Sequence, residues 1–206
     1  MRVLIVDDHP IVISGCRAML AHRNDIEVLE AGDGDTGVAV YATKRPDVAV
    51  IDINLPGISG FEVMRRILAF DANAKVIVFS MNDEVIFAAR AIESGAKGYF
   101  TKNDDPSDFV GAITKVAGGG VYLSSDLAQQ VAFHHLRPGS GPLEKLNARE
   151  IEILRLLGSG KNMSEIASII DVSYKTVANS CSQIKQKLAV RSQLDLVRIA
   201  VENKLT

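Results

Sequence analysis

The amino-acid sequence predicts an α/β doubly wound domain with a five-stranded parallel sheet, followed by a smaller all-α domain of four helices. Short apolar runs alternate with amphipathic stretches through about the first 120 residues, as in repeated βα units. Beyond residue 143, every apolar pattern has helical spacing. The 206 residues are 47% apolar and 23% charged, which is typical of a globular protein and excludes a disordered or disulfide-based chain.

Five short runs rich in Val, Ile and Phe are expected to be strands buried on both faces of the sheet, at 2–6, 26–29, 48–51, 76–79 and 98–100. Helices are expected between and after them, at 10–21, 34–43, 60–69, 84–94 and 106–117. Asp33-Gly34 and Pro56-Gly57 mark loops. Five such units indicate the doubly wound arrangement, for which we expect strand order 2-1-3-4-5.

The second half begins with a short helix at 125–136 and a Pro- and Gly-rich run at 137–142, which is typical of a linker. Asn147 is the expected N-cap of the next helix. Three more helices are expected at 164–170, 174–189 and 193–203, with a tight turn before the longer one. The predicted division is a first domain over 1–122, a linker with a short helix over 123–143 and a second domain over 144–206.

The net charge of −2 hides an uneven distribution. Residues 1–143 carry 13 Lys or Arg and 18 Asp or Glu, whereas residues 144–206 carry 10 and 7. The basic second domain indicates an anionic partner such as nucleic acid, although a short basic strip is more often a solvated helix face.

The two cysteines, Cys16 and Cys181, lack metal-ligand spacing and fit packed thiols in a reducing cytosol. Asp7 and Asp8 interrupt the apolar core that a signal peptide would need, and no uncharged run is long enough to span a membrane. A cytoplasmic location is therefore expected.

Polar residues stand at the ends of four predicted strands: Asp7 and Asp8, Asp52, Ser80 and Lys102. Ligands of open parallel sheets bind at the carboxyl ends of the strands, where the strand order reverses. Three carboxylates there favour Mg²⁺, which can also hold a phosphoryl group. Lys102 could neutralise phosphoryl oxygens, Ser80 could donate a hydrogen bond, and Asp52 could be the nucleophile that forms an aspartyl phosphate.

A simpler interpretation holds for each residue alone, because a single Asp at a strand end usually caps the following helix. The joint occurrence at four strand ends favours the phosphoryl site. His9 is expected to be an exposed loop residue, and His134-His135 to belong to the short helix, since no third ligand is near them in sequence.

These residues resemble the receiver domain of two-component response regulators over residues 1 to about 122. The resemblance is carried by Asp7-Asp8, Asp52, Pro56-Gly57, Gly60, Ser80, Gly95-Ala96-Lys97-Gly98-Tyr99 and Lys102. It implies a flavodoxin-like fold and an Asp52 that accepts a phosphoryl group from a sensor histidine kinase. It also implies Mg²⁺ held by Asp8, Asp52 and the backbone carbonyl of Asn54, with Asp7 helping through water.

The same resemblance implies that Ser80 and Tyr99 form a conformational switch. New phosphoryl oxygens attract Ser80, and the vacated space lets the Tyr99 ring turn inward. Asn103 stands where many members carry Pro after the lysine.

The helices at 164–170 and 174–189 form a helix-turn-helix pattern, whose second helix enters the major groove of DNA. The sequence from Leu146 to Leu196 resembles a LuxR-type DNA-binding domain, on Leu146-Asn147-Ala148-Arg149-Glu150, Ile166-Ala167, Ser173-Tyr174-Lys175-Thr176-Val177, Lys187-Leu188 and Val190-Arg191-Ser192. A receiver followed by this domain resembles the NarL/FixJ class of response regulators.

That resemblance implies base contacts by Ala178, Asn179 and Ser182, and phosphate contacts by Lys175, Thr176, Lys185, Lys187 and Arg191. The amide of Asn179 suits adenine. Many relatives carry a basic residue at the position of Ala178 and His at that of Ser180, so weaker non-specific binding or more dependence on dimerisation is expected. Ile166, Ile169, Val177, Ile184 and Leu188 are expected in the core of this domain.

The sequence thus predicts a transcription regulator that dimerises and binds DNA when Asp52 is phosphorylated, and no enzymatic role beyond its own phosphoryl transfer and dephosphorylation. One alternative is a magnesium-dependent phosphatase, although Asn54 stands where such an enzyme needs a second carboxylate. Another is a DNA-binding regulator that ignores phosphate and uses the receiver for docking or dimerisation.

Overall fold

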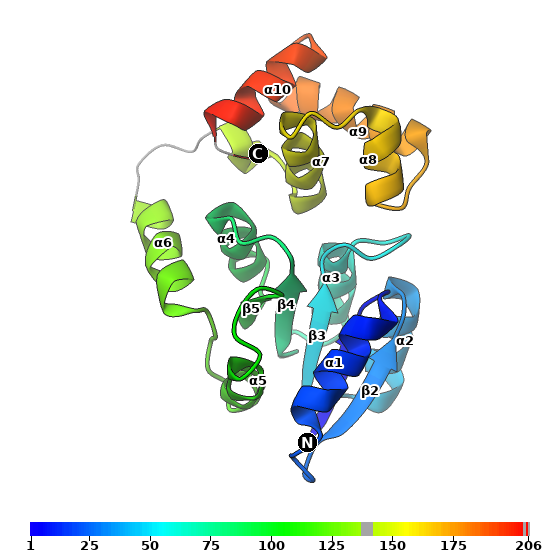
Figure 1. Cartoon of the computed structure of the whole chain (residues 1–206), viewed down its shortest axis with the longest axis vertical. Coiled ribbons are helices and arrows are strands. Elements are labelled where there is room, and N and C mark those ends of the chain that lie inside the picture. Colours follow the sequence, from blue (N-terminus) through cyan, green and yellow to red (C-terminus); the bar gives the residue numbers. More distant parts are fainter. Residues whose placement is uncertain (137–141, 204, 206) are drawn as a thin grey trace. The chain divides into compact units, whose positions relative to one another are not determined.

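The computed structural model describes residues 1–136, 142–203 and 205, which cluster into two units, Met1–Leu136 and Arg137–Thr206 (Figure 1). The expected linker at 137–142 lies almost wholly outside the described residues. In the described part of the chain, no helix is long and apolar enough to cross a membrane. The domain boundaries expected from the sequence stay a prediction.

The first unit contains a parallel sheet whose order, β2-β1-β3-β4-β5, confirms the predicted doubly wound fold. The strands are β1 (Arg2–Val6), β2 (Glu27–Ala31), β3 (Val48–Asp52), β4 (Val76–Ser80) and β5 (Gly98–Thr101). The helices are α1 (Pro10–Leu20), α2 (Gly34–Lys44), α3 (Gly60–Phe70), α4 (Val85–Glu93), α5 (Asp108–Ala117) and α6 (Ser125–Leu136). The five predicted strands and six predicted helices are present, with ends that differ by a residue or two.

Strands β3, β4 and β5 are buried along their whole length, which explains their unbroken apolar runs. Alternate residues of these strands point to opposite faces. On one face, residues such as Val50, Phe79 and Phe100 pack with Cys16 of α1 and Phe109 of α5 in one apolar core. Helices α2, α3 and α4 contact strands of the same sheet. The outer strand β2 is only partly buried.

The start of α3 approaches the end of β3 so closely that only glycine fits there. A Cβ on Gly60 would lie 1.9 Å from the backbone oxygen of Asp52. The Gly60 N–H donates to the carbonyl of Ile53 at 2.9 Å. This contact folds the segment after Asp52 back against the strand end, and Ser59 caps α3 by accepting from the Glu62 N–H.

A single residue beyond α5 extends the sheet past β5. The Tyr122 N–H donates to Lys97 O at 2.9 Å, and Tyr122 O accepts from the Tyr99 N–H at 3.0 Å. The Tyr122 ring stacks on Phe100, with ring centroids 5.8 Å apart. Helix α6 then contacts α4 and buries Leu127 and Val131. The sequence did not predict this extension.

The second unit consists of a short 3₁₀ helix η1 (Pro142–Lys145) and the helices α7 (Ala148–Gly158), α8 (Met163–Ile169), α9 (Tyr174–Lys187) and α10 (Gln193–Glu202). All four predicted helices are present; η1 was not predicted. Asn147 caps α7 as predicted, in a capping box with Glu150. Asn162 and Ser192 form capping boxes at α8 and α10, and Ser173 caps α9.

The core of this unit includes Ile166, Val177 and Ile184, as expected. Ile169 was expected in that core as well, but it is 50% exposed, so this prediction is wrong. Helix α8 is short and buries a stripe made by Ile166, Ala167 and Ile170. Ile169 lies more than a quarter turn from the centre of that stripe and therefore faces solvent.

Candidate functional site

The acidic residues that follow β1 and end β3 lie together at the carboxyl edge of the sheet. Ligand atoms of Asp7, Asp8, His9 and Asp52 all lie within 4.8 Å of one another. Asp7 and Asp52 are buried, and the side chain of Asp8 is partly exposed. The structure thus gathers the three carboxylates that the sequence predicted to meet.

Lys102, in the loop after β5, reaches back between two of these carboxylates. Its Nζ lies 2.7 Å from Asp7 Oδ2 and 2.9 Å from Asp52 Oδ2. Burial raises the pKa of Asp52, and the Lys102 charge opposes that rise. Burial lowers the pKa of Lys102, but Asp52 and Asp7 outweigh it, so this pKa lies above its ordinary value. One cation is thus shared by two buried acids.

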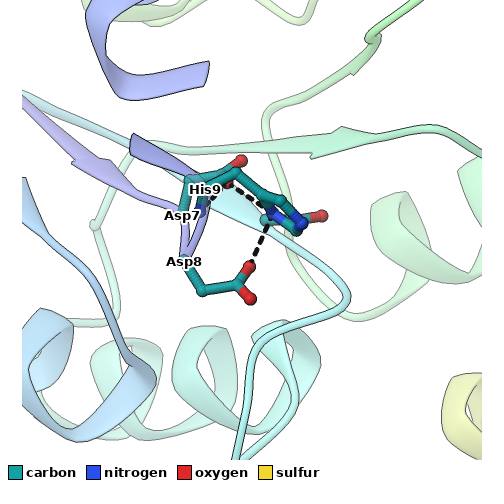
Figure 2. Close-up of side chains that lie close together, drawn as sticks. Asp7, Asp8 and His9 are labelled. Atoms are coloured by element: carbon teal, nitrogen blue, oxygen red, sulfur yellow. Dashed lines mark hydrogen bonds and ion pairs between the residues drawn. The ribbon is translucent and has the colours of Figure 1, made fainter. Parts of the chain in front are cut away.

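His9 contacts the acidic cluster, although the sequence predicted only an exposed loop residue. Its side chain is 60% exposed, and its Nδ1 lies 2.9 Å from Asp8 Oδ1 and 3.3 Å from Asp7 Oδ1. Figure 2 shows the His9 ring turned toward the Asp8 carboxylate. His9 directly follows Asp8 in the sequence, and this neighbouring position was the signal that could have indicated the contact.

The donor set fits a hard divalent cation. Three carboxylates converge at one point, and such oxygen ligands are those that Mg²⁺ prefers. The Asn54 N–H donates to Asp52 Oδ1 at 3.2 Å, which keeps the segment after β3 next to the cluster. The side-chain Oδ1 of Asn54 is buried and accepts no hydrogen bond from the residues that the structure describes. An oxygen left without a donor beside three carboxylates is consistent with a site for a cation and its water.

Ser80 and Tyr99 are both fully buried and lie on neighbouring strands. The Asn82 N–H donates to Ser80 Oγ at 3.1 Å, and Tyr99 Oη donates to the Asn82 carbonyl at 2.7 Å. Asn82 therefore joins the two residues that the sequence predicted as a switch. The Lys102 N–H donates to Ser80 O at 2.7 Å, which fixes Lys102 beside the same strand end.

The loop that carries Lys102 is held without the proline that many receivers have. The Asp104 N–H donates to Thr101 O at 3.1 Å, and Asp104 Oδ2 accepts from the Thr101 N–H at 2.8 Å. These two bonds close a turn around Lys102 and Asn103. The carboxylate of Asp104 thus restrains the backbone of the Lys102 loop in place of a proline.

Helix α9 presents a polar face that includes most of the predicted DNA contacts. Lys175, Thr176, Asn179, Ser182 and Lys187 are exposed, Ala178 and Lys185 are half-buried, and Arg191 is exposed just beyond the helix. The opposite face buries Val177, Cys181 and Ile184. A helix with one buried apolar face and one polar face, following a short helix and a turn, can enter a DNA groove.

Some of these polar side chains already have partners in the protein. Ser182 Oγ donates to Ala178 O at 3.0 Å, and Thr176 Oγ1 lies 2.8 Å from the Oγ of the cap Ser173. Lys187 Nζ lies 2.6 Å from Oε2 of the buried Glu150. In contrast, Lys175 has no ion-pair partner among the described residues.

Sequence reasoning missed the contact by which the half-buried Arg149 joins two helices of this unit. Arg149 Nη2 donates to the carbonyl of Ile170, at the end of α8, at 2.6 Å. Burial lowers the pKa of Arg149, and the charges of Glu152 and Asp171 oppose that effect. Only the pairing of Arg149 with Glu150 in sequence hinted at a structural role.

Comparison with protein families gives two matches along the chain. Residues 3–114 match the model of the response regulator receiver domain. Residues 144–200 match that of the bacterial regulatory proteins of the luxR family.

Known proteins resemble the chain along its whole length. Response regulator UvrY of Escherichia coli (strain K12) is 33% identical over 100% of this chain and 95% of that protein. Response regulator GacA of Pseudomonas aeruginosa is 32% identical over 98% of this chain and 96% of that protein. The solved structure of RcsB from Salmonella enterica serovar Typhimurium, bound to promoter rprA with the phosphomimetic BeF3-, has a TM-score of 0.64 at 25% identity and covers 98% of each chain.

Proposed function

This chain belongs to the response regulators that join a receiver domain to a LuxR-type DNA-binding domain and regulate transcription in two-component systems, and we propose that Asp52 is the residue that receives the phosphoryl group. The contact of Lys102 with both Asp52 and Asp7 is the observation that carries this proposal. A buried carboxylate beside a buried ammonium, at the carboxyl edge of the sheet, is the geometry that phosphoryl transfer needs.

In the proposed reaction, an oxygen of Asp52 attacks the phosphorus of a phosphohistidine in a sensor kinase. A P–O bond forms, the P–N bond breaks, and the electron pair of that bond goes to the histidine nitrogen. Lys102 lies between Asp52 and Asp7 and would neutralise charge on the phosphoryl oxygens. The chain's own chemistry would be this transfer and the later hydrolysis of the aspartyl phosphate.

Receiver domains typically bind Mg²⁺, and the acidic cluster fits this ion. Asp8, Asp52 and the backbone carbonyl of Asn54 would hold it, with Asp7 acting through water. Bound there, Mg²⁺ would neutralise charge on the phosphoryl group. Asp7 is also positioned to fix Lys102, since their polar atoms lie 2.7 Å apart.

The switch would connect the phosphoryl group to the rest of the receiver. Ser80 would donate a hydrogen bond from its hydroxyl to a phosphoryl oxygen and so move the segment that includes Asn82. The Tyr99 phenol is bonded to the Asn82 carbonyl, so it would follow that movement. Phosphorylation would shift the equilibrium between conformations that already exist and would not create a new conformation.

For the DNA-binding domain, we propose base contacts by Ala178, Asn179 and Ser182. Phosphate contacts would come from Lys175, Thr176, Lys185 and Arg191, whereas the phosphate contact predicted for Lys187 competes with its ion pair to the buried Glu150. Asn179 is exposed on α9 and can pair with adenine. A phosphorylated dimer would match two half-sites related by approximate two-fold symmetry. The place of action would be the bacterial cytoplasm, where the promoter DNA is.

Selection of DNA from genomic fragments tests this function. The full-length protein would be used with and without acetyl phosphate and magnesium, beside the Asp52→Asn variant. We expect a two-fold site to be enriched only by the phosphorylated wild type. Acid-stable, hydroxylamine-resistant labelling of the variant would instead indicate an acceptor other than Asp52.

The remaining outcomes are equally decisive. Enrichment of the same site with and without phosphorylation would support the proposed DNA-binding domain but limit the receiver to docking or dimerisation. Absence of enrichment in every state would contradict the proposed DNA contacts, with Ala178 and Ser180 as the first residues to replace.

A further inference from the structure

The imidazole of His9 faces carboxylate oxygens of the acidic cluster that Lys102 does not contact. The Nδ1 of His9 lies 2.9 Å from Asp8 Oδ1 and 3.3 Å from Asp7 Oδ1. Lys102 contacts the other oxygen of Asp7, Oδ2, and the Oδ2 of Asp52. Figure 2 shows the ring and the Asp8 carboxylate turned toward each other. One nitrogen and two oxygens therefore form a group of three potential ligand atoms beside the ammonium group.

Capping of α1 does not account for the position of this ring. His9 is the N-cap residue of α1, yet its side chain makes no capping hydrogen bond. Its backbone N–H donates to Asp7 Oδ1 at 2.9 Å, which turns the residue toward the cluster. The Oδ1 atom of Asp8 is buried and accepts no hydrogen bond from the described residues, although His9 Nδ1 is close. A nitrogen and an oxygen at this distance without a hydrogen bond are arranged as two lone-pair donors to one ion.

The spacing of these atoms is that of neighbouring ligands on one metal ion. Bonds of about 2.0–2.2 Å in an octahedral or tetrahedral arrangement separate adjacent ligand atoms by about 2.8–3.6 Å. The two distances from His9 Nδ1, 2.9 and 3.3 Å, fall within that range. Asp52 completes the group, since ligand atoms of all four residues lie within 4.8 Å of one another.

An imidazole nitrogen changes which ion such a site prefers. Carboxylate oxygens suit Mg²⁺, whereas imidazole suits Ni²⁺, Zn²⁺ and other transition-metal ions. Among these ions, the affinity of mixed nitrogen and oxygen sites rises from Mn²⁺ to Ni²⁺ and Cu²⁺. The His9 side chain is 60% exposed, so an ion can reach its nitrogen from solvent.

We propose that His9 is a further ligand at this cluster and that its Nδ1 selects a divalent transition-metal ion over Mg²⁺. The inference rests on the proposed magnesium site and extends it to a second class of ion. The two ions compete for the same carboxylates, so a transition-metal ion at low concentration displaces Mg²⁺ at a higher one. A different role for His9, as a positive charge that only offsets Asp7 and Asp8, predicts that removal of the ring strengthens the binding of every cation.

Isothermal titration calorimetry of the full-length protein with Mg²⁺, Mn²⁺ and Ni²⁺, at fixed pH and ionic strength, tests the inference. We expect His9→Gln to lower the affinity for Ni²⁺ roughly 10- to 100-fold and that for Mn²⁺ less, and to leave that for Mg²⁺ within about 2-fold of the wild type. The unchanged Mg²⁺ affinity also shows that the carboxylates are still in place. His22→Gln removes an exposed imidazole just beyond α1 and should match the wild type for all three ions.

Pulsed electron paramagnetic resonance of bound Mn²⁺ gives a second readout that does not depend on affinity. A coupling to an imidazole nitrogen should be present in the wild type and in His22→Gln and absent from His9→Gln. Equal Ni²⁺ affinity in the wild type and His9→Gln, stronger binding of every ion by His9→Gln, or no nitrogen coupling in the wild type would overturn the inference alone. Ion binding that Asp8→Asn leaves unchanged for all three ions would overturn the proposed magnesium site with it.

Discussion

The phenol of Tyr99 donates a hydrogen bond of 2.7 Å to the backbone carbonyl of Asn82. Both residues are buried, and the Asn82 N–H in turn donates to Ser80 Oγ. The backbone N–H of the same Tyr99 donates to Tyr122, beyond α5. One residue of β5 is thus bonded both to the segment that follows Ser80 and to the chain that continues toward α6.

We expect Tyr99→Phe to weaken this connection and to destabilise the receiver. The variant removes the hydrogen bond from the phenol to a buried carbonyl, which should lower the free energy of unfolding by about 1–2 kcal/mol. It should also reduce the difference in DNA affinity between phosphorylated and unphosphorylated protein. Urea denaturation and anisotropy measure the two effects. Tyr122→Phe is the control, and equal values for both variants would refute the prediction.

Millimolar magnesium should raise the melting temperature of the receiver, because an ion that binds only the folded state stabilises it by mass action. Asp8→Asn should largely remove that increase, since it takes one carboxylate from the cluster. Asp126→Asn, at the start of α6, should keep it. Differential scanning calorimetry at matched ionic strength is the measurement. The same increase in wild type and Asp8→Asn would show that the cluster is not the magnesium site.

Stability at high pH should depend on Tyr41. Burial and a hydrogen bond to Asp71 raise the pKa of Tyr41 from 10.0 to about 12. Below pH 10 Tyr41 keeps its proton in both the folded and the unfolded protein, so its full contribution to stability is present. Between the two pKa values only the unfolded form ionises, so stability falls as pH rises, by something on the order of 2 kcal/mol. Tyr41→Phe should lack this part of the decline.

Chemical denaturation of the wild type and of Tyr41→Phe across that pH range measures the difference. Absorbance of the phenolate provides a second readout, because the late ionisation of Tyr41 should be present in the wild type and missing from the variant. Parallel stability curves in both proteins would contradict the assigned pKa.

The sheet and the acidic site were predictable because their signals are local. Buried parallel strands require continuous apolar runs, and the polar residues that follow them must meet at one edge. Asp7, Asp52 and Lys102 could therefore be placed together before any contact was known. The alternation of strands and helices indicated a doubly wound sheet, and the order 2-1-3-4-5 expected for it is the one that the structure has.

Other features depend on partners that are distant in sequence and leave no pattern. The bonds of Tyr122 to β5 involve backbone atoms, which every residue has. Arg149 donates a hydrogen bond to the carbonyl of Ile170, 21 positions away, and no sequence spacing indicates that contact. Ile169 faces solvent because it lies more than a quarter turn from the stripe that α8 buries, and the apolar periodicity of so short a helix is a weak guide to its buried face.

Ala189 should be a position where glycine stabilises the protein. It follows the C-cap Leu188 with a φ of 56°, in the left-handed region that costs a residue with a Cβ about 1–2 kcal/mol. Part of that gain is lost to the greater freedom of glycine in the unfolded chain, so Ala189→Gly should add about 0.5–1 kcal/mol. Gln183→Gly, within α9, should instead destabilise. Urea denaturation decides, and a loss of stability in Ala189→Gly would contradict the assigned backbone conformation.

Lys187 should matter more for stability than for DNA binding. Its Nζ lies 2.6 Å from the carboxylate of Glu150, which is buried at the start of α7. Lys187→Gln would leave this carboxylate without its cation and should cost roughly 1–3 kcal/mol. Because the charge is already used inside the domain, the slope of affinity against salt should stay near that of the wild type. A slope lowered by about one unit would instead make Lys187 the phosphate contact that the sequence predicted.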